Sequence, residues 1–303
     1  MPNVRAVPTL RRRRLGDALR VYRRRAGLSL DRAAELMGWA ESKLSRIENA
    51  LARMHPQDIA VLLALYGVTD SGTVTALEGL ARDASKTGWW QPYGDVVAIS
   101  YRDYLTLESD AGSTHIYTPE LIPGLLQTGA YAREVIAATA ITRTPEEVTA
   151  LAEVRKARQT ILTTRDGGPL TLWAVIHESA FHKRFAATPT IMRDQLRHLL
   201  DMADLPNITI QVMPLAATPH PGMLGTFEIV RFPAPWPNVV TLESLRGTTF
   251  IEGTDDAAIF SAAFQRIVAA ALSVDDSRQL IKTIIEKGNW TPWAVKTTST
   301  NST

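Results

Sequence analysis

Cysteine is absent from this chain of 303 residues. Without thiols the chain can form neither a disulfide framework nor a thiolate metal site. No segment approaches the roughly 18 consecutive apolar residues that a membrane-spanning helix needs. The basic start of the sequence also lacks the apolar run that follows it in a secretory signal. We therefore expect a soluble, cytoplasmic protein with no membrane partner.

Signatures of catalysis and of cofactor binding are also missing. The sequence contains no glycine-rich phosphate loop and no spacing that indicates a Ser–His–Asp group. His177, Glu178 and His182 resemble a zinc protease box, but that box needs histidines four residues apart, and these two are five apart. We expect His177 to end a strand and Glu178 to lie in the first turn of a helix. No enzyme activity, metal or cofactor is expected.

Charge is unevenly distributed along the chain. Residues 1–60 hold 13 Lys and Arg against 6 Asp and Glu, whereas the remaining residues hold 20 against 25. The net charge of +2 therefore conceals a basic first segment on a mildly acidic remainder. Such an asymmetry suggests a polyanionic partner for the basic segment. The alternative is that the run Arg11, Arg12, Arg13 and Arg14 is merely solvated and unstructured.

Apolar periodicity predicts five short helices in residues 1–85. Apolar residues recur at steps of three and four in residues 15–26, 30–37, 41–49, 56–66 and 73–84. Gly27 and Gly38 end the first two helices, and Ser29 is a good N-cap for the second. Glycine, proline and polar residues then cluster in SKTGWWQPYGD, residues 85–95, where we place the domain boundary. The pair Trp89 and Trp90 indicates that one of them packs against a neighbouring domain.

Residues 86–290 predict an α+β domain with a largely antiparallel sheet. Strands are expected at residues 169–176, 208–213, 225–232, 239–243 and 248–252, mostly joined by short loops. Helices are expected at residues 101–113, 146–163, 191–203, 255–272 and 276–286. The helix over residues 255–272 is apolar on two adjacent stripes, so it is either central core, which we favour, or part of a dimer interface. The polar tail, residues 291–303, is predicted to be disordered.

The third predicted helix separates polar from apolar residues. Leu44 and Ile47 are three residues apart and share the face toward the core, so the intervening polar residues project outward. Two short helices joined by a glycine-containing turn indicate a helix-turn-helix, whose second helix enters the DNA major groove. We expect DNA contacts from Arg11, Arg12, Arg13, Arg14, Ser29, Glu41, Ser42, Lys43, Ser45 and Arg46. Arg46 suits bidentate pairing with guanine, and Lys43 suits a phosphate.

The stretch LGDALRVYRRRAGLSLDRAAELMGWAESKLSRIENA resembles the lambda-repressor-like, Xre-type helix-turn-helix. The ending SRIEN is the specific feature, and the resemblance implies that Glu48 is structural and pairs with Arg20 or Arg23. Two positions depart from the pattern. Ala40 replaces the usual Ser or Thr cap, and Ala50 replaces the glycine that usually follows Asn49.

The rest of the chain resembles the body domain of WhiJ-like actinobacterial regulators. The motif PGLLQTGAYAR carries this resemblance most specifically, with RKARQTIL, NITIQVMPL and GTFEIVRF. Gln127, Thr128 and Tyr131 of that motif are candidates for a ligand or partner pocket. The alternative, which we favour, is a loop that enters a core helix.

These observations predict a transcriptional regulator, a homodimer on an inverted-repeat operator in double-stranded DNA. Its second domain would dimerise and receive a ligand or a small protein encoded nearby. One alternative is an antitoxin that neutralises a cognate toxin and regulates its own promoter. Another is an enzyme that the DNA-binding domain merely localises.

Overall fold

The computed structural model describes residues 9–84, 88–139, 141–165, 167–185, 188–233 and 236–288. The chain forms two compact units. The first comprises Met1–Gly94, Ala98–Asp110 and Phe232–Pro237, and the second comprises Asp95–Val97, Ala111–Arg231 and Asn238–Thr303. Two later segments therefore belong with the N-terminal helices. The domain limits predicted at residues 85 and 290 stay predictions, and the predicted tail lies outside the described residues.

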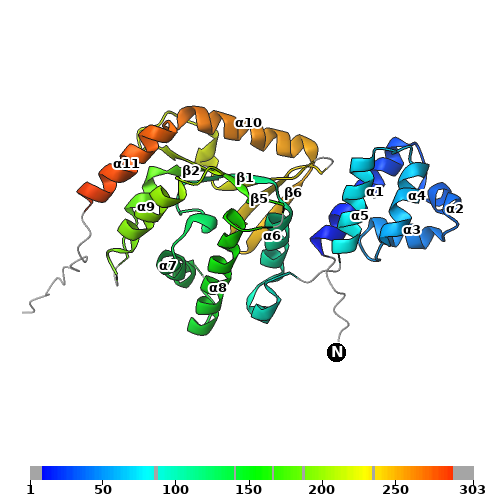
Figure 1. Ribbon diagram of the computed structural model, residues 1–303, viewed down its shortest axis with the longest axis horizontal. Coiled ribbons are helices and arrows are strands. Elements are labelled where there is room, and N and C mark those ends of the chain that lie inside the picture. The colour runs from blue at the N-terminus through cyan, green and yellow to red at the C-terminus, as the bar shows by residue number, and fades with distance from the viewer. Residues whose placement is uncertain are drawn as a thin grey trace, which may run out of the picture. The chain divides into compact units, whose positions relative to one another are not determined.

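Five helices form what we call the head, as predicted (Figure 1). They are α1 (Leu10–Arg25), α2 (Leu30–Leu36), α3 (Glu41–Glu48), α4 (Pro56–Leu65) and α5 (Ser71–Asp83). The first unit also contains most of the 3-10 helix η1 (Gln91–Val96) and all of α6 (Ile99–Asp110). Helix α1 begins five residues before the predicted start, because the Thr9 side chain caps it by accepting from the Arg12 amide at 3.4 Å. The arginine run 11–14 is therefore helical and not unstructured.

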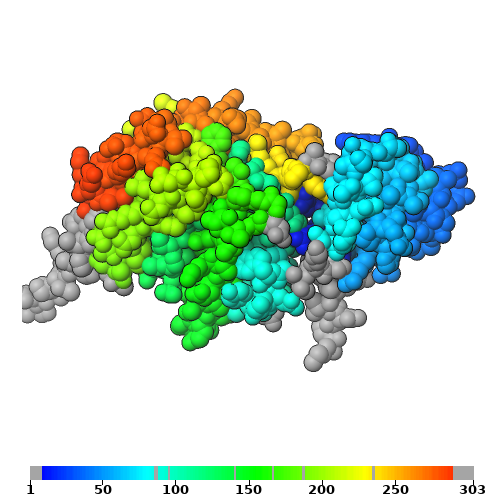
Figure 2. All heavy atoms as spheres, in the orientation of Figure 1, coloured from blue at the N-terminus to red at the C-terminus, as the bar shows by residue number. Residues whose placement is uncertain are grey.

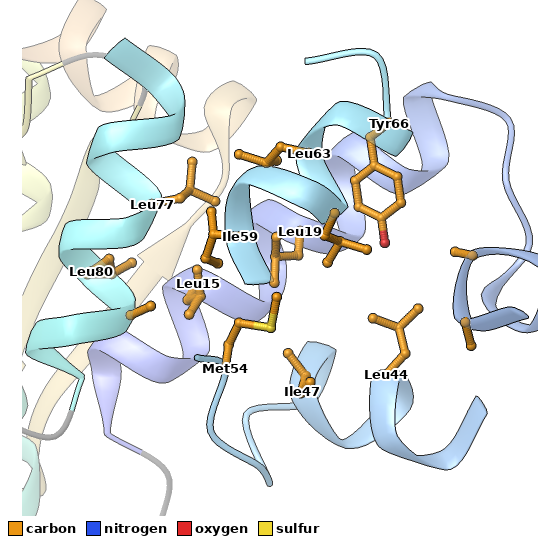
Figure 3. Close-up of a cluster of buried hydrophobic side chains, with 14 residues drawn as sticks. Leu15, Leu19, Leu44, Ile47, Met54, Ile59, Leu63, Tyr66, Leu77 and Leu80 are labelled. Carbon is orange, nitrogen blue, oxygen red and sulfur yellow. The ribbon is translucent and has the colours of Figure 1, made fainter. Parts of the chain in front are cut away.

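The head has its own apolar core (Figure 3). Leu15 and Leu19 of α1 meet Leu44 and Ile47 of α3 there, as the apolar spacing predicted. The other buried members come from α2, α4, α5 and the loop before α4: Ala33, Ala34, Met54, Ile59, Leu62, Leu63, Tyr66, Leu77, Leu80 and Ala81. Because this core uses the apolar face of α3, only polar residues of that helix remain outside.

The second unit, which we call the body, is an α+β domain, as predicted. Its strands are β1 (Ser113–Thr118), β2 (Thr171–His177), β3 (Ile208–Met213), β4 (Phe227–Arg231), β5 (Val239–Ser244) and β6 (Gly247–Glu252). Its α-helices are α7 (Gly129–Thr139), α8 (Pro145–Arg158), α9 (Ile191–Met202), α10 (Thr254–Ala270) and α11 (Val274–Lys287). Short 3-10 helices are η2 (Gly124–Leu126), η3 (Gln159–Leu162), η4 (Glu178–His182) and η5 (Pro221–Leu224).

The six strands form one mixed sheet in the order β3-β2-β1-β4-β5-β6. The neighbours β1–β2 and β2–β3 are parallel, whereas β1–β4, β4–β5 and β5–β6 are antiparallel. The parallel half follows from its connections, because α7 and α8 lie between β1 and β2 in the chain, and α9 lies between β2 and β3. Antiparallel pairs still outnumber parallel ones.

Helices cover both faces of the sheet (Figure 1). Helix α10 packs on one face through Phe264 and Ile267, against Tyr117, Val175 and other strand residues. One side of α10 therefore belongs to the core, but the central position that the two apolar stripes predicted is wrong, because Ala257, Phe264 and Ile267 are its only buried residues. Its opposite side is at the body surface, where Ile259 is 66% exposed, and α10 and α11 are both visible in the space-filling view (Figure 2). Helices α7, α8 and α9 lie on the other side of the sheet (Figure 1).

Strand β1 was not predicted, and the predicted helix over residues 101–113 is too long. Helix α6 ends at Asp110, and Ser113 already pairs with Thr171 of β2 and Arg231 of β4. The strand STHIYT occupies the middle of the sheet although four of its six residues are Ser, Thr or His. Tertiary pairing on both sides therefore outweighs its weak apolar signal.

His115 of β1 is a buried histidine between aromatic rings. It stacks on Phe264 with ring centroids 4.9 Å apart and meets Trp173 edge-on at 5.5 Å. Burial, with a smaller contribution from the charge of Arg231, lowers its pKa to about 4. The folded body therefore holds a neutral imidazole at neutral pH.

We predict that this histidine destabilises the body at acidic pH. The unfolded chain binds a proton near pH 6.5 and the folded chain only near pH 4, so stability is lost as pH falls between these values. The loss should reach roughly 3 kcal/mol. Denaturant unfolding at several pH values should show a shallower pH dependence for His115→Phe. His182→Gln, at an exposed histidine, is the control, and an equal slope in His115→Phe and the native chain would contradict the prediction.

Candidate nucleic-acid interface

Helix α3 presents a polar surface because its apolar residues are used by the head core. Leu44 and Ile47 are buried, whereas Glu41, Ser42, Lys43 and Arg46 are exposed. Ser45 is half-buried. The division between inward and outward faces agrees with the prediction from spacing. Contact of these residues with DNA stays a prediction.

The side chains on the outer face of α3 differ in how free they are. The Arg46 guanidinium makes no hydrogen bond or ion pair within the described part of the chain. The Lys43 ammonium lies 3.6 Å from the ring centroid of Trp39, in a cation–π contact. The Ser45 carbonyl accepts from the Asn49 side-chain amide at 2.8 Å. The Arg46 guanidinium is thus free to bind a ligand, whereas Lys43 would first have to leave the Trp39 ring.

A glycine allows α1 to touch the end of α3. A methyl group at Gly16 would lie 2.5 Å from the Glu48 carbonyl oxygen and 2.9 Å from that of Ile47. No real side chain tolerates such distances to backbone, so the two helices approach this closely only because residue 16 is glycine. Gly16 therefore has a packing reason for lying inside a helix, where glycine normally weakens the structure.

Two arginines of α1 hold the carboxyl end of α3. Arg23 forms a bidentate pair with the buried Glu48 carboxylate, at 2.7 and 2.8 Å. This hydrogen bonding raises the pKa of Arg23. Arg20 donates to the Glu48 carbonyl at 2.7 Å and to the Asn49 side chain at 2.8 Å, and its Nε lies 3.6 Å from the Glu48 carboxylate. The expected pairing of Glu48 is confirmed with both arginines.

The two departures from the usual motif have visible structural effects. Ala40 is the N-cap of α3 and supplies no side-chain hydrogen bond. Ala50 adopts a φ of 60°, the left-handed conformation, and among the described residues no other non-glycine has a positive φ. Both changes cost local stability, by about 1 kcal/mol for a missing cap. Contacts from α1 offset this cost at the carboxyl end of the helix.

Ser29, predicted to contact DNA, is the N-cap of α2. Its hydroxyl oxygen accepts from the Arg32 amide at 3.4 Å, and the residue is exposed. A cap residue at a helix start is also close to free backbone amides, which suits a phosphate. Ser29 lies on α2 and the polar residues on α3, so the two helices of the motif supply the candidate interface.

The arginine run 11–14 is largely engaged within the first unit. Arg11 donates to Asp110 at 2.7 and 2.9 Å and to the Asp83 carbonyl at 3.2 Å. Arg13 donates to Asp103 at 2.8 Å. Both carboxylates belong to α6. These pairs show that the two arginines help to attach α6 to α1, and their predicted contact with phosphates stays a prediction.

Arg14 is buried against Phe232 and Trp236 of the same unit. Its guanidinium lies 3.7 Å from the Phe232 ring centroid and 5.2 Å from that of Trp236. Trp236 also packs against the head core. Because Arg14 is only 7% exposed, its main role here is structural.

The candidate pocket residues hold their own loop in place. The Gln127 side chain donates to the Ile122 carbonyl at 2.7 Å and accepts from Arg155 at 3.0 Å. The Thr128 amide donates to Gln195 at 2.7 Å, and the Tyr131 hydroxyl accepts from the Ile122 amide at 3.2 Å. The three residues are therefore brought together, but their polar groups are used in fixing the loop. This arrangement supports the alternative of a loop entering a core helix.

The rejected zinc pattern lies where the spacing argument placed it. His177 ends β2, and Glu178 begins the 3-10 helix η4. Glu178 accepts from the Leu215 amide at 3.0 Å and lies 3.5 Å from His182. Within the described ranges, no group of three His, Cys, Asp or Glu side chains could hold a metal ion.

Several residues important to this region carry no local sequence signal. Asp103 and Asp110 lie about 90 or more residues from their arginine partners, and Trp236 lies in a short proline-rich loop. Lys43 and Trp39, by contrast, are four residues apart across a turn. That pair could have been suspected from the sequence, whereas the long-range pairs could not.

Comparison with known protein families gives two matches. Residues 14–75 match a family described as a helix-turn-helix domain, and residues 101–283 match a family described as domain of unknown function DUF5753. No curated protein matches the chain. Because the second match covers more than half of the sequence, the chain belongs to the DUF5753 family. The helix-turn-helix match supports DNA binding and a role in transcription regulation.

No single helix in the described part of the chain is both long and apolar enough to cross a membrane. Helices α10 and α11, which are bent by 64° relative to each other, together reach the length and apolar composition of a span.

We predict that Gly16→Ala disrupts the head. The added methyl group would force α1 and α3 apart and should lower the free energy of unfolding by about 1–3 kcal/mol. Gly79→Ala is the matched control, because Gly79 is in α5 with nothing within 4 Å of an added methyl group. That change should stabilise the head, by up to about 1 kcal/mol. Thermal unfolding of both variants tests this, and equal effects would show that the contact with Glu48 is not limiting.

Proposed function

We propose that this protein is a sequence-specific DNA-binding transcriptional regulator without enzymatic activity. The observation that carries the proposal is the outer face of α3, where exposed polar side chains lie over a buried apolar face in a matched helix-turn-helix domain. An α-helix of this kind fits the major groove of B-DNA, and its exposed residues then meet base edges.

The proposed readout assigns a different contact to each residue. Arg46, whose guanidinium has no partner among the described residues, donates two hydrogen bonds to guanine O6 and N7. Glu41 accepts a hydrogen bond from cytosine N4. It contributes to sequence discrimination more than to affinity, since a carboxylate near phosphates weakens binding. Ser42 and Ser45 are short enough to let the helix approach. Lys43 leaves Trp39 and binds a phosphate.

Binding of DNA phosphates by the arginine run requires that two of its ion pairs be broken. Arg11 and Arg13 reach a phosphate only if it replaces Asp110 and Asp103, which hold them now. Arg12 has no ion-pair partner within the described residues, so it is the member of the run best placed to bind an anion.

We propose that the body dimerises the protein and receives a ligand or a small protein. Large apolar side chains exposed on α10 and the adjacent η5 support a role for this surface in dimerisation: Ile259 is 66%, Met223 72% and Leu224 96% exposed. The antitoxin hypothesis has the resemblance of the sequence in its favour and no structural observation of its own. Cytoplasmic location and an inverted-repeat operator stay predictions.

We predict that Arg46→Ala relaxes sequence recognition. On an operator obtained by selection from random DNA, it should cost about 1–3 kcal/mol and remove the preference at one base position of each half-site. Arg246→Ala, at an exposed arginine of the body, is the control for loss of a positive charge. If Arg46→Ala weakens operator and random DNA equally, Arg46 contacts a phosphate instead.

We predict that the full-length protein sediments as a dimer, because one head reads too few base pairs for genomic specificity. Introducing a charge at the exposed apolar surface of α10 and η5, with Ile259→Glu and Leu224→Glu together, should shift the dimer toward monomer and weaken operator binding. Leu245→Glu changes a residue that is 84% exposed elsewhere in the body and should not. A monomeric native chain would refute dimerisation, and a dimer insensitive to the double change would place the interface elsewhere.

A further inference from the structure

A cavity in the head is lined by positive side chains, and no carboxylate belongs to the described residues that line it. It has a volume of about 260 Å³ and lies between the start of α1, the loop after α3 and the end of α5. Its polar wall consists of Arg12, Arg53, Arg82 and His55. None of the three arginines forms an ion pair within the described residues, and the Nε atom of Arg12 is buried without a hydrogen-bond partner.

The amino end of α4 adds to the positive character of this cavity. His55 and Pro56, the N-cap and first residue of α4, line it, and His55 makes no side-chain cap hydrogen bond. Pro56 has no amide hydrogen, and the Asp58 amide donates to the His55 carbonyl at 3.0 Å, so the Gln57 amide is left at this helix start without a capping side chain. An anion here is favoured by that amide and by the helix dipole. The uncapped helix and the unpaired arginines are independent features, and both favour a negatively charged ligand.

The opposite wall of the cavity is apolar. Leu15, Ile47 and Met54, which lie side by side in Figure 3, contribute to it together with Ala81. A bare inorganic anion would leave this apolar wall without a contact. A molecule that carries both a negative group and a small apolar group satisfies both walls.

We propose that this cavity binds a small amphiphilic anion, with a phosphate or carboxylate group at the arginines and an aliphatic or aromatic group over Leu15, Ile47 and Met54. Because Ile47 is in the last turn of α3, the occupant touches the recognition helix from its buried side. The site would allow a metabolite to act on the head directly, without a signal from the body.

The test uses the full-length chain with isotope-labelled methionine methyl groups, and the Met54 signal is identified with Met54→Leu. Phenyl phosphate is the probe, with inorganic phosphate and benzyl alcohol as its anionic and apolar halves, all at constant ionic strength. Phenyl phosphate should shift the Met54 signal saturably, and each half should bind at least about tenfold more weakly. No shift of this signal, or equal binding of either half, overturns the proposal.

Matched variants locate the anion. Arg53→Gln with Arg82→Gln should weaken phenyl phosphate binding about tenfold or more, since each removes a charge-assisted contact. Both arginines are exposed, and circular dichroism checks the fold; Arg246→Gln in the body should change nothing. DNA binding by the same variants separates the sources of phosphate. If they lose DNA affinity while the native chain does not bind phenyl phosphate, these arginines contact DNA phosphates, and the proposed site is refuted while the proposed function stands.

Discussion

The position of α3 depends on a contact between two stretches of backbone. At Gly16 the first helix comes so close to the end of α3 that no side chain fits between them. That approach brings Arg20 and Arg23 within reach of Glu48, so both the buried carboxylate and the backbone carbonyl of Glu48 accept hydrogen bonds from α1. An unpaired buried charge would be costly, so glycine, arginines and glutamate form one interdependent set. The outer face of α3 is presented correctly only because its inner end is held this way.

In the body, hydrogen bonds between side chains and loop backbone play a comparable part. In the loop after β1, four carbonyls accept from the side chains of Gln127, Gln159 and Gln195, and the Thr128 amide donates to Gln195. Two of these glutamines come from later segments, at the end of α8 and on α9. The motif that carries the likeness to other regulators is therefore explained by the needs of a buried loop, because buried backbone groups must be paired.

Local patterns predicted the parts of this protein whose residues act on near neighbours. The five head helices, the two faces of α3 and the five strands β2 to β6 follow from local patterns, and each of these strands begins and ends within two residues of its predicted bounds. Strand β1 was not predicted, because its pairing with β2 and β4 and not its own composition makes it a strand. The charge of the arginine run is local and so predicts contact with DNA or with solvent, whereas its partners Asp103, Asp110 and Trp236 are distant in sequence. No periodicity reports such contacts.

The first unit is assembled from three separate stretches of chain, and this limits how the protein can be rearranged. Phe232–Pro237 reaches the first unit from within the body sequence, between β4 and β5, and α6 precedes the central strand. A head joined to its partner by a single linker can be exchanged by one recombination event. Here a single exchange after residue 94 would place Leu80, Arg14 and Asp83 against an α6 and a loop from another protein, whose residues had not evolved to pack with them. Head and body are therefore expected to have diverged together, as one inherited pair.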